Sequence, residues 1–342
     1  MDHVVVVGAS AGGVESLREV VRKLPADFPA PVVVVLHIPP YQPSSLPEIL
    51  TAAGSLPALH PNDGARMKAG HIYVAPPDYH LLIDRDRLVV KKGPKENSFR
   101  PSIDALFRSA AYNYGAKVIG VVLSGALDDG TSGLWTIKRL GGVAIVQKPN
   151  DARFESMPLS ALANVDVDER LPASEIGGLL ARLVSGSRPV RAAEEDDTLR
   201  KRIGTELAIA VEGKAFAKGI IDMGELTPFT CPECHGALVK LQEEKMTRYR
   251  CHTGHGYTDS ALLESVMETT GEMLYQVMRS LEEAVMLLEH MGRHIEATDD
   301  GERAKRYFGK ARELRARTKK LHDAVEQHET LSGEKLVAGA RD

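Results

Sequence analysis

The segment Gly8-Ala9-Ser10-Ala11-Gly12 follows a run of four valines near the start of the chain. This G-x-S-x-G pattern places small residues on both sides of a serine, and they permit a sharp strand-to-helix turn that exposes the hydroxyl. The N-terminus of the following helix offers free N–H groups and partial positive charge to an oxyanion. We therefore predict that Ser10 is the nucleophile of an acyl transfer, with the backbone N–H of Ala11 as an oxyanion donor.

Two other interpretations of this loop remain open. Ser10 is also a suitable helix N-cap in an ordinary tight turn. A glycine-rich loop after a first strand also binds dinucleotides, in which case an acidic residue should follow the second strand. The second strand instead ends in Leu36-His37-Ile38-Pro39-Pro40, and no tyrosine is followed four residues later by the lysine that dehydrogenase chemistry uses. Dinucleotide binding is therefore the weakest interpretation.

A serine nucleophile needs a base and an acid that orients the base. His37 follows the second strand, and Asp128 and Asp129 follow a later one in VVLSGALDDGTSGL. Because the carboxyl ends of parallel strands meet at one edge of a sheet, Ser10, His37 and one of the two aspartates are expected to lie together. The residue order Ser, His, Asp differs from that of α/β-hydrolases, which disfavours a lipase-type fold.

Strand-like and helix-like patterns alternate up to about residue 185, and they predict an α/β domain with a doubly wound, mostly parallel sheet. Val4–Val7 and Val32–Leu36 are β-branched or apolar throughout, as strands buried on both faces are. Further strands are expected at residues 71–75, 117–123 and 143–147. Residues 80–90 are expected to form a hairpin, and helices are expected at residues 13–23, 102–114 and 131–140, with Ser102 as an N-cap.

Six stretches in order resemble the catalytic domain of chemotaxis protein-glutamate methylesterases, the CheB-like family. They are GASAGG, LHIPP, HIYVAPPDYHLLI, RPSIDALF, LSGALDDGTSGL and MPLSAL, and they lie within residues 1–185. The resemblance implies a Ser-His-Asp triad at Ser10, His37 and Asp129, with Asp129 rather than Asp128 because it directly precedes the glycine. It also implies hydrolysis of glutamate γ-methyl esters on chemoreceptor-like proteins with release of methanol. Deamidation of receptor glutamines would follow the same chemistry, and no cofactor is needed.

The chain departs from the family pattern beside the predicted site. Ala11 stands where the family has threonine, and Ala126 and Leu127 stand where it has methionine and glycine. Oxyanion donation by the backbone N–H groups of Ala11 and Ala126 survives such changes, whereas substrate preference can differ. The receiver domain common in the family is not expected, because the first strand begins almost at Met1. We interpret Arg100 in RPSIDALF as a structural residue rather than a ligand of substrate.

A second motif lies at Cys231-x2-Cys234 and Cys251-x3-His255, with sixteen residues between the two pairs. Short spacings of this kind make two ligand-bearing turns for tetrahedral Zn²⁺. Three cysteines and one histidine leave no open position, so the metal is expected to be structural. His235 and His252 are rival fourth ligands, and His255 is favoured by its spacing. Some relatives of the family carry a similar zinc segment and helical hairpin after the esterase domain.

We predict five regions. The regions are a catalytic domain at 1–185, a polar linker at 186–225, a zinc module at 226–258, an antiparallel helical hairpin at 259–330 and a flexible tail at 331–342. The hairpin is inferred from apolar residues that recur three and four positions apart, such as Leu274, Val277, Leu281 and Val285. Its apolar stripe is mainly a packing seam, and part of it is a candidate surface for a signalling partner.

The composition limits the other partners of the chain. The net charge of −4 gives no electrostatic support for nucleic-acid binding, and no apolar stretch approaches the ~20 residues of a membrane span. Three cysteines cannot form an even disulfide framework, so a cytoplasmic location is expected. The alternative to an esterase is a non-catalytic signalling scaffold, in which a degenerate esterase domain and the zinc and helical segments bind partners.

Overall fold

The structure is a computed structural model, and it describes residues 2–186, 197–297 and 301–326. The chain divides into two compact units, Met1–Leu262 and Leu263–Asp342. Among the described residues, no helix combines the length and the apolar character that crossing a bilayer requires.

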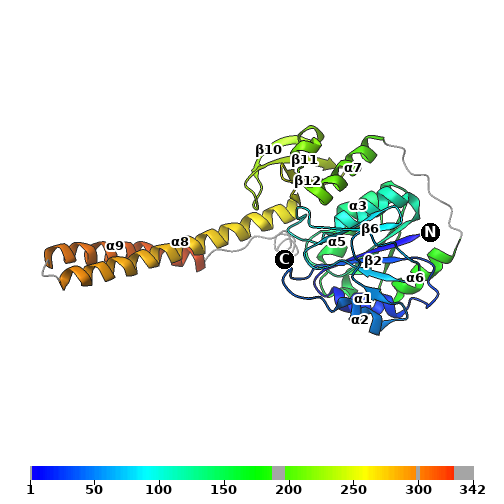
Figure 1. Cartoon of the computed structure of the whole chain (residues 1–342), viewed down its shortest axis with the longest axis horizontal. Coiled ribbons are helices and arrows are strands. Elements are labelled where there is room, and N and C mark those ends of the chain that lie inside the picture. The colour runs from blue at the N-terminus through cyan, green and yellow to red at the C-terminus, as the bar shows by residue number, and fades with distance from the viewer. Residues whose placement is uncertain (1, 187–196, 298–300, 327–342) are drawn as a thin grey trace. The chain divides into compact units, whose positions relative to one another are not determined.

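The first unit is built on a seven-stranded sheet in which every neighbouring pair of strands is parallel (Figure 1). The strand order is β3-β4-β2-β1-β7-β8-β9. The strands are β1 (Val4–Ala9), β2 (Val32–Leu36), β3 (Ala58–Leu59), β4 (Ile72–Val74), β7 (Val118–Val122), β8 (Val143–Gln147) and β9 (Glu169–Leu171). β1 lies at the centre, with β2 on one side and β7 on the other, so the chain reverses its direction of winding beside β1.

The valine run of β1 is apolar throughout because both faces of the sheet are covered. Val4 and Val6 belong to one hydrophobic core, and Val5 and Val7 belong to the other. Side chains along a strand alternate between the two faces, so a strand that serves two cores needs no polar position. The prediction of a doubly wound α/β domain is confirmed.

In the described part of the chain, six helices cover the two faces of this sheet. One face carries α1 (Gly13–Arg22), α2 (Leu46–Ala53) and α6 (Ala173–Ser185), and the other carries α3 (Ile103–Tyr114), α4 (Thr131–Arg139) and α5 (Ser156–Asn164). Figure 1 shows α1 and α2 on the opposite side of the sheet from α3. Short 3-10 turns occupy Gly115–Lys117, Pro149–Asp151, Phe216–Lys218 and Ile220–Met223.

A separate antiparallel hairpin joins β5 (His80–Asp84) to β6 (Arg87–Lys91) through a turn at residues 85 and 86. Arg85 takes a φ of 52°, the left-handed conformation that a two-residue hairpin turn uses. The side chain of Ser102 accepts a hydrogen bond from the N–H of Ala105 and caps α3, as predicted.

The region that the sequence suggested as a polar linker contains a helix. This helix, α7 (Asp197–Glu212), buries Leu199 and Ile203 in the hydrophobic core that also contains the apolar residues of α3. Glu206 of α7 is buried as well. The linker interpretation depended on the low apolar content of the segment, but a helix needs only one narrow apolar stripe to dock. Of the predicted linker, residues 187–196 lie outside the described part of the chain.

A four-stranded antiparallel sheet follows α7 in the first unit. Its strands are β10 (Glu225–Thr230), β11 (Ala237–Glu243), β12 (Met246–Cys251) and β13 (Gly256–Thr258). We call residues 225–262 the cysteine module. Six residues make up its own buried cluster, namely Cys231, Leu238, Tyr249, Cys251, Tyr257 and Leu262.

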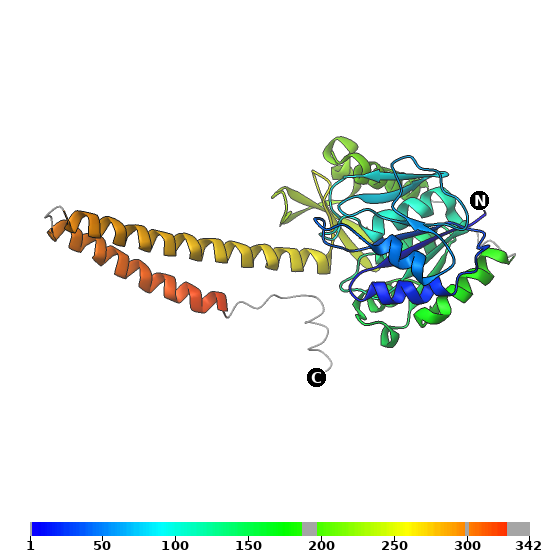
Figure 2. The ribbon, with the colours of Figure 1, turned by 60° about the horizontal axis from the view of Figure 1, so that its bottom comes forward.

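The second unit consists of a helical hairpin. α8 (Asp259–Glu296) begins in the first unit, and α9 (Gly301–Glu326) runs back alongside it (Figure 2). Val285 on α8 and Ala311 on α9 are buried in the seam, whereas Val266 and Val277 are exposed. The apolar pattern of α8 is therefore wider than the face that α9 covers. The predicted tail at 331–342 lies outside the described residues.

Candidate active site and metal-binding cluster

Three neighbouring strands bring the predicted triad together. Ser10 follows β1 directly, His37 follows β2, and Asp129 lies in the loop between β7 and α4. Because β2, β1 and β7 are adjacent and parallel, their carboxyl ends share one edge of the sheet.

The three side chains form a continuous hydrogen-bonded chain. The Oγ of Ser10 lies 3.2 Å from Nδ1 of His37, and Nε2 of His37 lies 2.9 Å from Oδ2 of Asp129. A carboxylate only accepts, so Nε2 carries the proton and Nδ1 is free to accept the serine proton. In the serine-protease template the two ring nitrogens have the opposite assignment, but either nitrogen of an imidazole can act as the base.

The carboxylate of Asp129 is one of the most fully hydrogen-bonded groups at this edge. Besides His37, it accepts hydrogen bonds from the backbone N–H of Ile103 at 2.7 Å and the amide of Asn97 at 3.0 Å. The hydroxyl of Ser102 and the N–H of Asp104 donate to it as well. Burial opposes its ionisation, but the hydrogen bond and charge of His37, together with these N–H donors, hold the pKa of Asp129 below its usual range.

The N-terminus of α3 contributes two of these donors, the N–H groups of Ile103 and Asp104. The first N–H groups of a helix have no partner within the helix and carry partial positive charge, so they favour an ionised carboxylate. Asp104 itself is buried beside the charge of Asp129, and both effects raise its pKa well above the usual range. At this edge Asp129 is therefore the carboxyl that stays charged.

The turn around Ser10 is closely packed against the β7–α4 loop. Gly12 takes a φ of 69°, and a Cβ there would lie 2.8 Å from Cβ of Arg153 and 2.9 Å from Oγ of Ser124. A Cβ on Gly125 would lie 2.9 Å from Cβ of Ser10. The small residues of both loops are thus what allows Ser10 to approach the loop that contains Ala126.

Leu127 is one of the departures from the family pattern, and the structure holds it at a φ of 61°. This left-handed conformation disfavours a residue with a Cβ. The neighbouring Asp128 accepts a hydrogen bond from the hydroxyl of Thr258 in the cysteine module. Burial raises the pKa of Asp128 to about 7, and the charge of Asp129 adds to the shift.

Arg100 is a structural residue, as interpreted from the sequence. Its guanidinium donates to the backbone oxygen of Asp78 at 2.9 Å, to the carboxylate of Asp78 and to the backbone oxygen of Gly93 at 2.6 Å. These bonds hold the segment before α3 against the β5–β6 hairpin.

The sequence reasoning missed two residues that touch the triad. The ring of Phe99 stacks on the imidazole of His37, with 3.9 Å between centroids and 7° between planes. Asn97 donates to Asp129 from a turn that lies thirty-two residues before it. No spacing rule connects these residues to the triad, because their contacts depend on how the segment before α3 folds back over the sheet edge.

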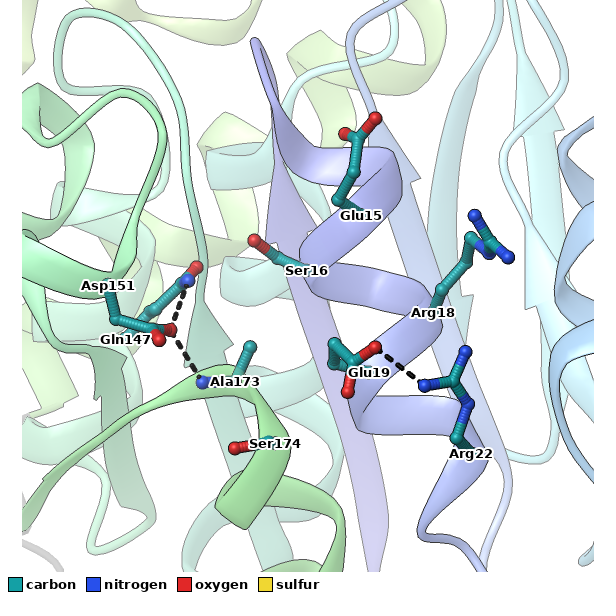
Figure 3. Close-up of a pocket in the computed structure, with 9 residues that line it drawn as sticks. All are labelled: Glu15, Ser16, Arg18, Glu19, Arg22, Gln147, Asp151, Ala173 and Ser174. Carbon is teal, nitrogen blue, oxygen red and sulfur yellow. Dashed lines mark hydrogen bonds and ion pairs between the residues drawn. The ribbon is translucent and has the colours of Figure 1, made fainter.

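A separate surface pocket of about 390 Å³ lies beside α1 (Figure 3). Its lining includes Glu19 and Arg22, which form an ion pair at 2.8 Å, and Asp151, which accepts from Gln147 and from the N–H of Ala173. None of the triad residues lines this pocket. The carboxylates of Glu19 and Asp151 are thus already bonded within the protein, and the pocket lies where α1 packs against α6.

The second predicted site also assembles. Cys231, Cys234, Cys251 and His255 place their ligand atoms within 4.8 Å of one another, whereas His235 and His252 do not belong to this group. Nδ1 of His255 lies 3.6 Å from Sγ of Cys231 and 3.5 Å from Sγ of Cys251, and Sγ of Cys234 lies 3.6 Å from that of Cys251. Ligand atoms about 3.8 Å apart are expected around tetrahedral Zn²⁺ with Zn–S bonds of about 2.3 Å.

Hydrogen-bond donors also surround the sulfur atoms of this cluster. The N–H of Gly254 donates to Sγ of Cys251, and the hydroxyl of Thr253 donates to Sγ of Cys234, both at 3.4 Å. Donors of this kind orient metal ligands and favour thiolates. The donor set of three sulfurs and one nitrogen, the distances and the surrounding donors all fit a metal such as Zn²⁺.

Comparisons with known proteins assign the first half of the chain to a protein family. The family model for the CheB methylesterase matches residues 5–180. The chain belongs to the CheB methylesterase family. A putative protein-glutamate methylesterase/protein-glutamine glutaminase of Leptospira interrogans is 39% identical over 180 residues, which are 52% of this chain and 93% of that protein. A protein-glutamate methylesterase/protein-glutamine glutaminase of Thermotoga maritima is 36% identical over 185 residues, 53% of this chain and 54% of that protein.

A solved structure agrees with this assignment. The crystal structure of the Thermotoga maritima CheB methylesterase catalytic domain matches 54% of this chain and 99% of its own length, with a TM-score of 0.52 and 35% identity. The family and the α/β fold that the sequence motifs implied are confirmed. The matched regions of the CheB domain end before the cysteine module begins.

Proposed function

We propose that the chain is a serine hydrolase that removes γ-methyl esters from glutamate side chains of chemoreceptor-like proteins. The observation that carries the proposal is the hydrogen-bonded chain from Ser10 through His37 to Asp129 at the edge of the sheet. The CheB relatives are named for this activity. Their names also include protein-glutamine glutaminase, and we propose deamidation as a second activity of the same site.

The proposed reaction has two steps. Nδ1 of His37 takes the proton of Ser10 while Oγ attacks the ester carbonyl, and the carbonyl oxygen becomes an oxyanion. The backbone N–H groups of Ala11 and Ala126 are our candidates for stabilising that oxyanion. The imidazolium then gives its proton to the departing methoxide, which leaves as methanol. Water activated by His37 hydrolyses the resulting acyl-serine, which frees the glutamate carboxylate and restores Ser10.

The test is methanol release from methylated receptor fragments by the full chain and by Ser10→Ala. We expect kcat to fall by about 10⁶-fold in the variant, because the reaction loses its nucleophile. Ser16→Ala is the matched control, since it removes a buried serine hydroxyl from α1 without touching the triad. The wild type should also be labelled on Ser10 by a fluorophosphonate, which requires an activated serine but no natural substrate.

These measurements separate the esterase from the alternative of a scaffold with a degenerate domain. A wild type that neither releases methanol nor reacts with the fluorophosphonate at Ser10 would support the scaffold. Labelling without methanol release would keep the hydrolase but change the substrate.

We also propose that Cys231, Cys234, Cys251 and His255 hold a structural Zn²⁺. A bound metal would supply much of the folding free energy of the cysteine module, since the module's own buried cluster contains only six residues. Four protein ligands leave no position for a water or substrate, so the metal is assigned no catalytic step.

A further inference from the structure

The tight turn Glu96–Phe99 lies between the cysteine module and the triad. The N–H of Phe99 donates to the oxygen of Glu96 at 2.9 Å, and the N–H of Glu96 donates back to Phe99 at 3.2 Å. Asn97 and Ser98, the two central residues, have φ values of 51° and 68°. Two left-handed residues in a row are the mark of a type I′ turn, and asparagine is one of the few side chains that accept this conformation. The turn is therefore well defined by its own sequence.

The cysteine module forms hydrogen bonds with one side of this turn. The N–H of Asn97 donates to the oxygen of Gly256 at 2.8 Å, and the N–H of Gly256 donates to the oxygen of Lys95 at 3.1 Å. The N–H of Thr258 donates to Oδ1 of Asn97 at 3.0 Å. β13 thus extends its hydrogen bonding onto the turn, immediately after His255 of the metal-binding cluster.

The other side of the turn contacts the triad. Nδ2 of Asn97 donates to Oδ1 of Asp129 at 3.0 Å and to Oδ2 of Asp104 at 3.2 Å. Asn97 is buried, so its amide has no water to replace these partners. Both N–H groups and the oxygen of the amide are used, and together they fix its orientation between Thr258 and Asp129. Two residues further on, Phe99 stacks on His37.

A buried ion network keeps the module in this position. Glu96 pairs with Arg108 of α3 and, at 2.9 Å, with Arg250 of β12. Glu206 of α7 pairs with Arg250 at 3.1 Å and with Arg248. All five side chains are at most 4% exposed. Separating such charges would leave them buried without partners, which is strongly unfavourable, so the module cannot shift easily relative to α3.

We propose that the cysteine module is a structural part of the hydrolase site, and that Asn97 is a positioning residue through which β13 holds the carboxylate of Asp129 for His37. A second contact supports the first, because the hydroxyl of Thr258 donates at 2.8 Å to Asp128, the neighbour of Asp129. Only the expected effect on substrate turnover rests on the proposed hydrolase function. The position of the Asp129–His37 pair can be measured without any substrate.

The first test compares Asn97→Ala with Asn113→Ala. Asn113 is a control of the same size, because its amide makes three hydrogen bonds with Ile83, Ser109 and Arg85, away from the triad. We expect the fluorophosphonate to inactivate Asn97→Ala about tenfold to a hundredfold more slowly than wild type, the ratio that one hydrogen bond to a charged group represents. The control should stay within about twofold. With a methylated substrate, kcat should fall while KM stays nearly constant.

A spectroscopic signature separates positioning from general destabilisation. In wild type the Nε2–H of His37, bonded to Asp129, should give a strongly downfield, slowly exchanging proton resonance. We expect this resonance to be lost or broadened in Asn97→Ala and kept in Asn113→Ala. If the resonance and the inactivation rate of Asn97→Ala match those of the control, the role of Asn97 is overturned, whatever the natural substrate is.

The second test perturbs the module side of the contact. A Cβ on Gly256 would lie 3.3 Å from the guanidinium of Arg250 and 3.4 Å from Cγ of Glu96, so the larger Gly256→Val should move β13 away from the turn. We expect inactivation at least tenfold slower than wild type. The double variant with Asn97→Ala should be inactivated at most about twofold more slowly than Gly256→Val alone, because both substitutions act through one contact.

Thr258→Val is the milder variant if Gly256→Val fails to fold, as judged by thermal unfolding. It keeps the shape of the side chain and removes the hydroxyl that binds Asp128. We expect inactivation about twofold to tenfold slower. A wild-type inactivation rate in folded Thr258→Val and Gly256→Val would overturn the part of the proposal that assigns the module to the site.

Discussion

The triad and the cysteine cluster are two side-chain sites in one compact unit, and they are assembled in opposite ways. Ser10 and His37 are 27 residues apart, and His37 and Asp129 are 92 apart. In the cluster the ligands come in two pairs, Cys231 with Cys234 and Cys251 with His255, each on a single short turn. The triad depends on a large parallel sheet with a hydrophobic core on each face, whereas the cluster has a buried core of six residues.

This difference shows where each site obtains its stability. The sheet holds the ends of β2, β1 and β7 in place through buried apolar side chains, so these strands bring Ser10, His37 and Asp129 to one edge without a metal ion. The proposed contact through Asn97 concerns only the final position of the Asp129 carboxylate. The turns of the cysteine module bury too little apolar surface for that, and a metal ion is expected to supply the missing free energy. Three measurements would test whether the two sites are stabilised in these different ways.

The largest effect is expected when the metal is lost. Structural Zn²⁺ in small modules contributes on the order of 10 kcal/mol, so His255→Ala should lose most of its bound zinc and unfold β10–β13 locally. His252→Ala is the matched control, because His252 lies outside the group of four. Metal content and hydrogen exchange would be measured on the full chains.

In this experiment β1 and β7 should remain protected from exchange, since their residues are almost fully buried in the two large cores. Loss of protection in β1 and β7 to the same extent as in β12 would show that the two regions unfold as one, and the comparison would fail.

The next effect concerns the triad alone. Asp129→Asn replaces an acceptor-only carboxylate with an amide, so His37 loses the charge that fixes its tautomer. We expect kcat to fall by about 10⁴-fold, as it does for this change in serine proteases. Bound zinc should be unchanged, because the substitution lies outside the cysteine module. A variant within tenfold of wild-type kcat would exclude Asp129 as the orienting acid.

The smallest effect concerns Asp128, whose pKa is raised from 3.8 to about 7 by burial. The folded state binds its proton more tightly than the unfolded chain does, so this group contributes stability below pH 4, and that stability is lost as the pH rises to about 7. In Asp128→Asn the side chain does not titrate, so this loss of stability at higher pH disappears. The amide oxygen can still accept the hydrogen bond from the hydroxyl of Thr258.

We therefore expect the free energy of unfolding of Asp128→Asn to exceed that of wild type by about 2 kcal/mol at pH 8. The full pKa shift would give a larger difference, but Asp128 keeps part of its contact with water, which weakens the effect of burial. At pH 4 the advantage should disappear. Urea unfolding at both pH values would measure it. An advantage that is equal at the two pH values would mean that Asp128 does not titrate as described.

The sequence alone predicted which side chains lie together at the sheet edge and the arrangement of elements around them. Valine runs such as Val4–Val7 predicted strands buried on both faces, and the rule that parallel strands end at one edge predicted that Ser10, His37 and one of two aspartates lie together. The resemblance to the CheB-like family then favoured Asp129 over Asp128. The spacing of Cys231, Cys234, Cys251 and His255 predicted the cluster, since ligands on short turns need only local geometry.

The connection between the two sites depends on the tertiary structure. Nothing in the sequence predicted that α7 would dock on the core, or that Asn97 would lie between Thr258 and Asp129. The physical reason is that these contacts join distant parts of the chain. Asn97 is 32 residues from Asp129 and 161 residues from Thr258, so its contacts depend on the register and packing of whole elements. Local composition and spacing carry no record of such contacts, and only the folded chain brings these groups within reach of one another.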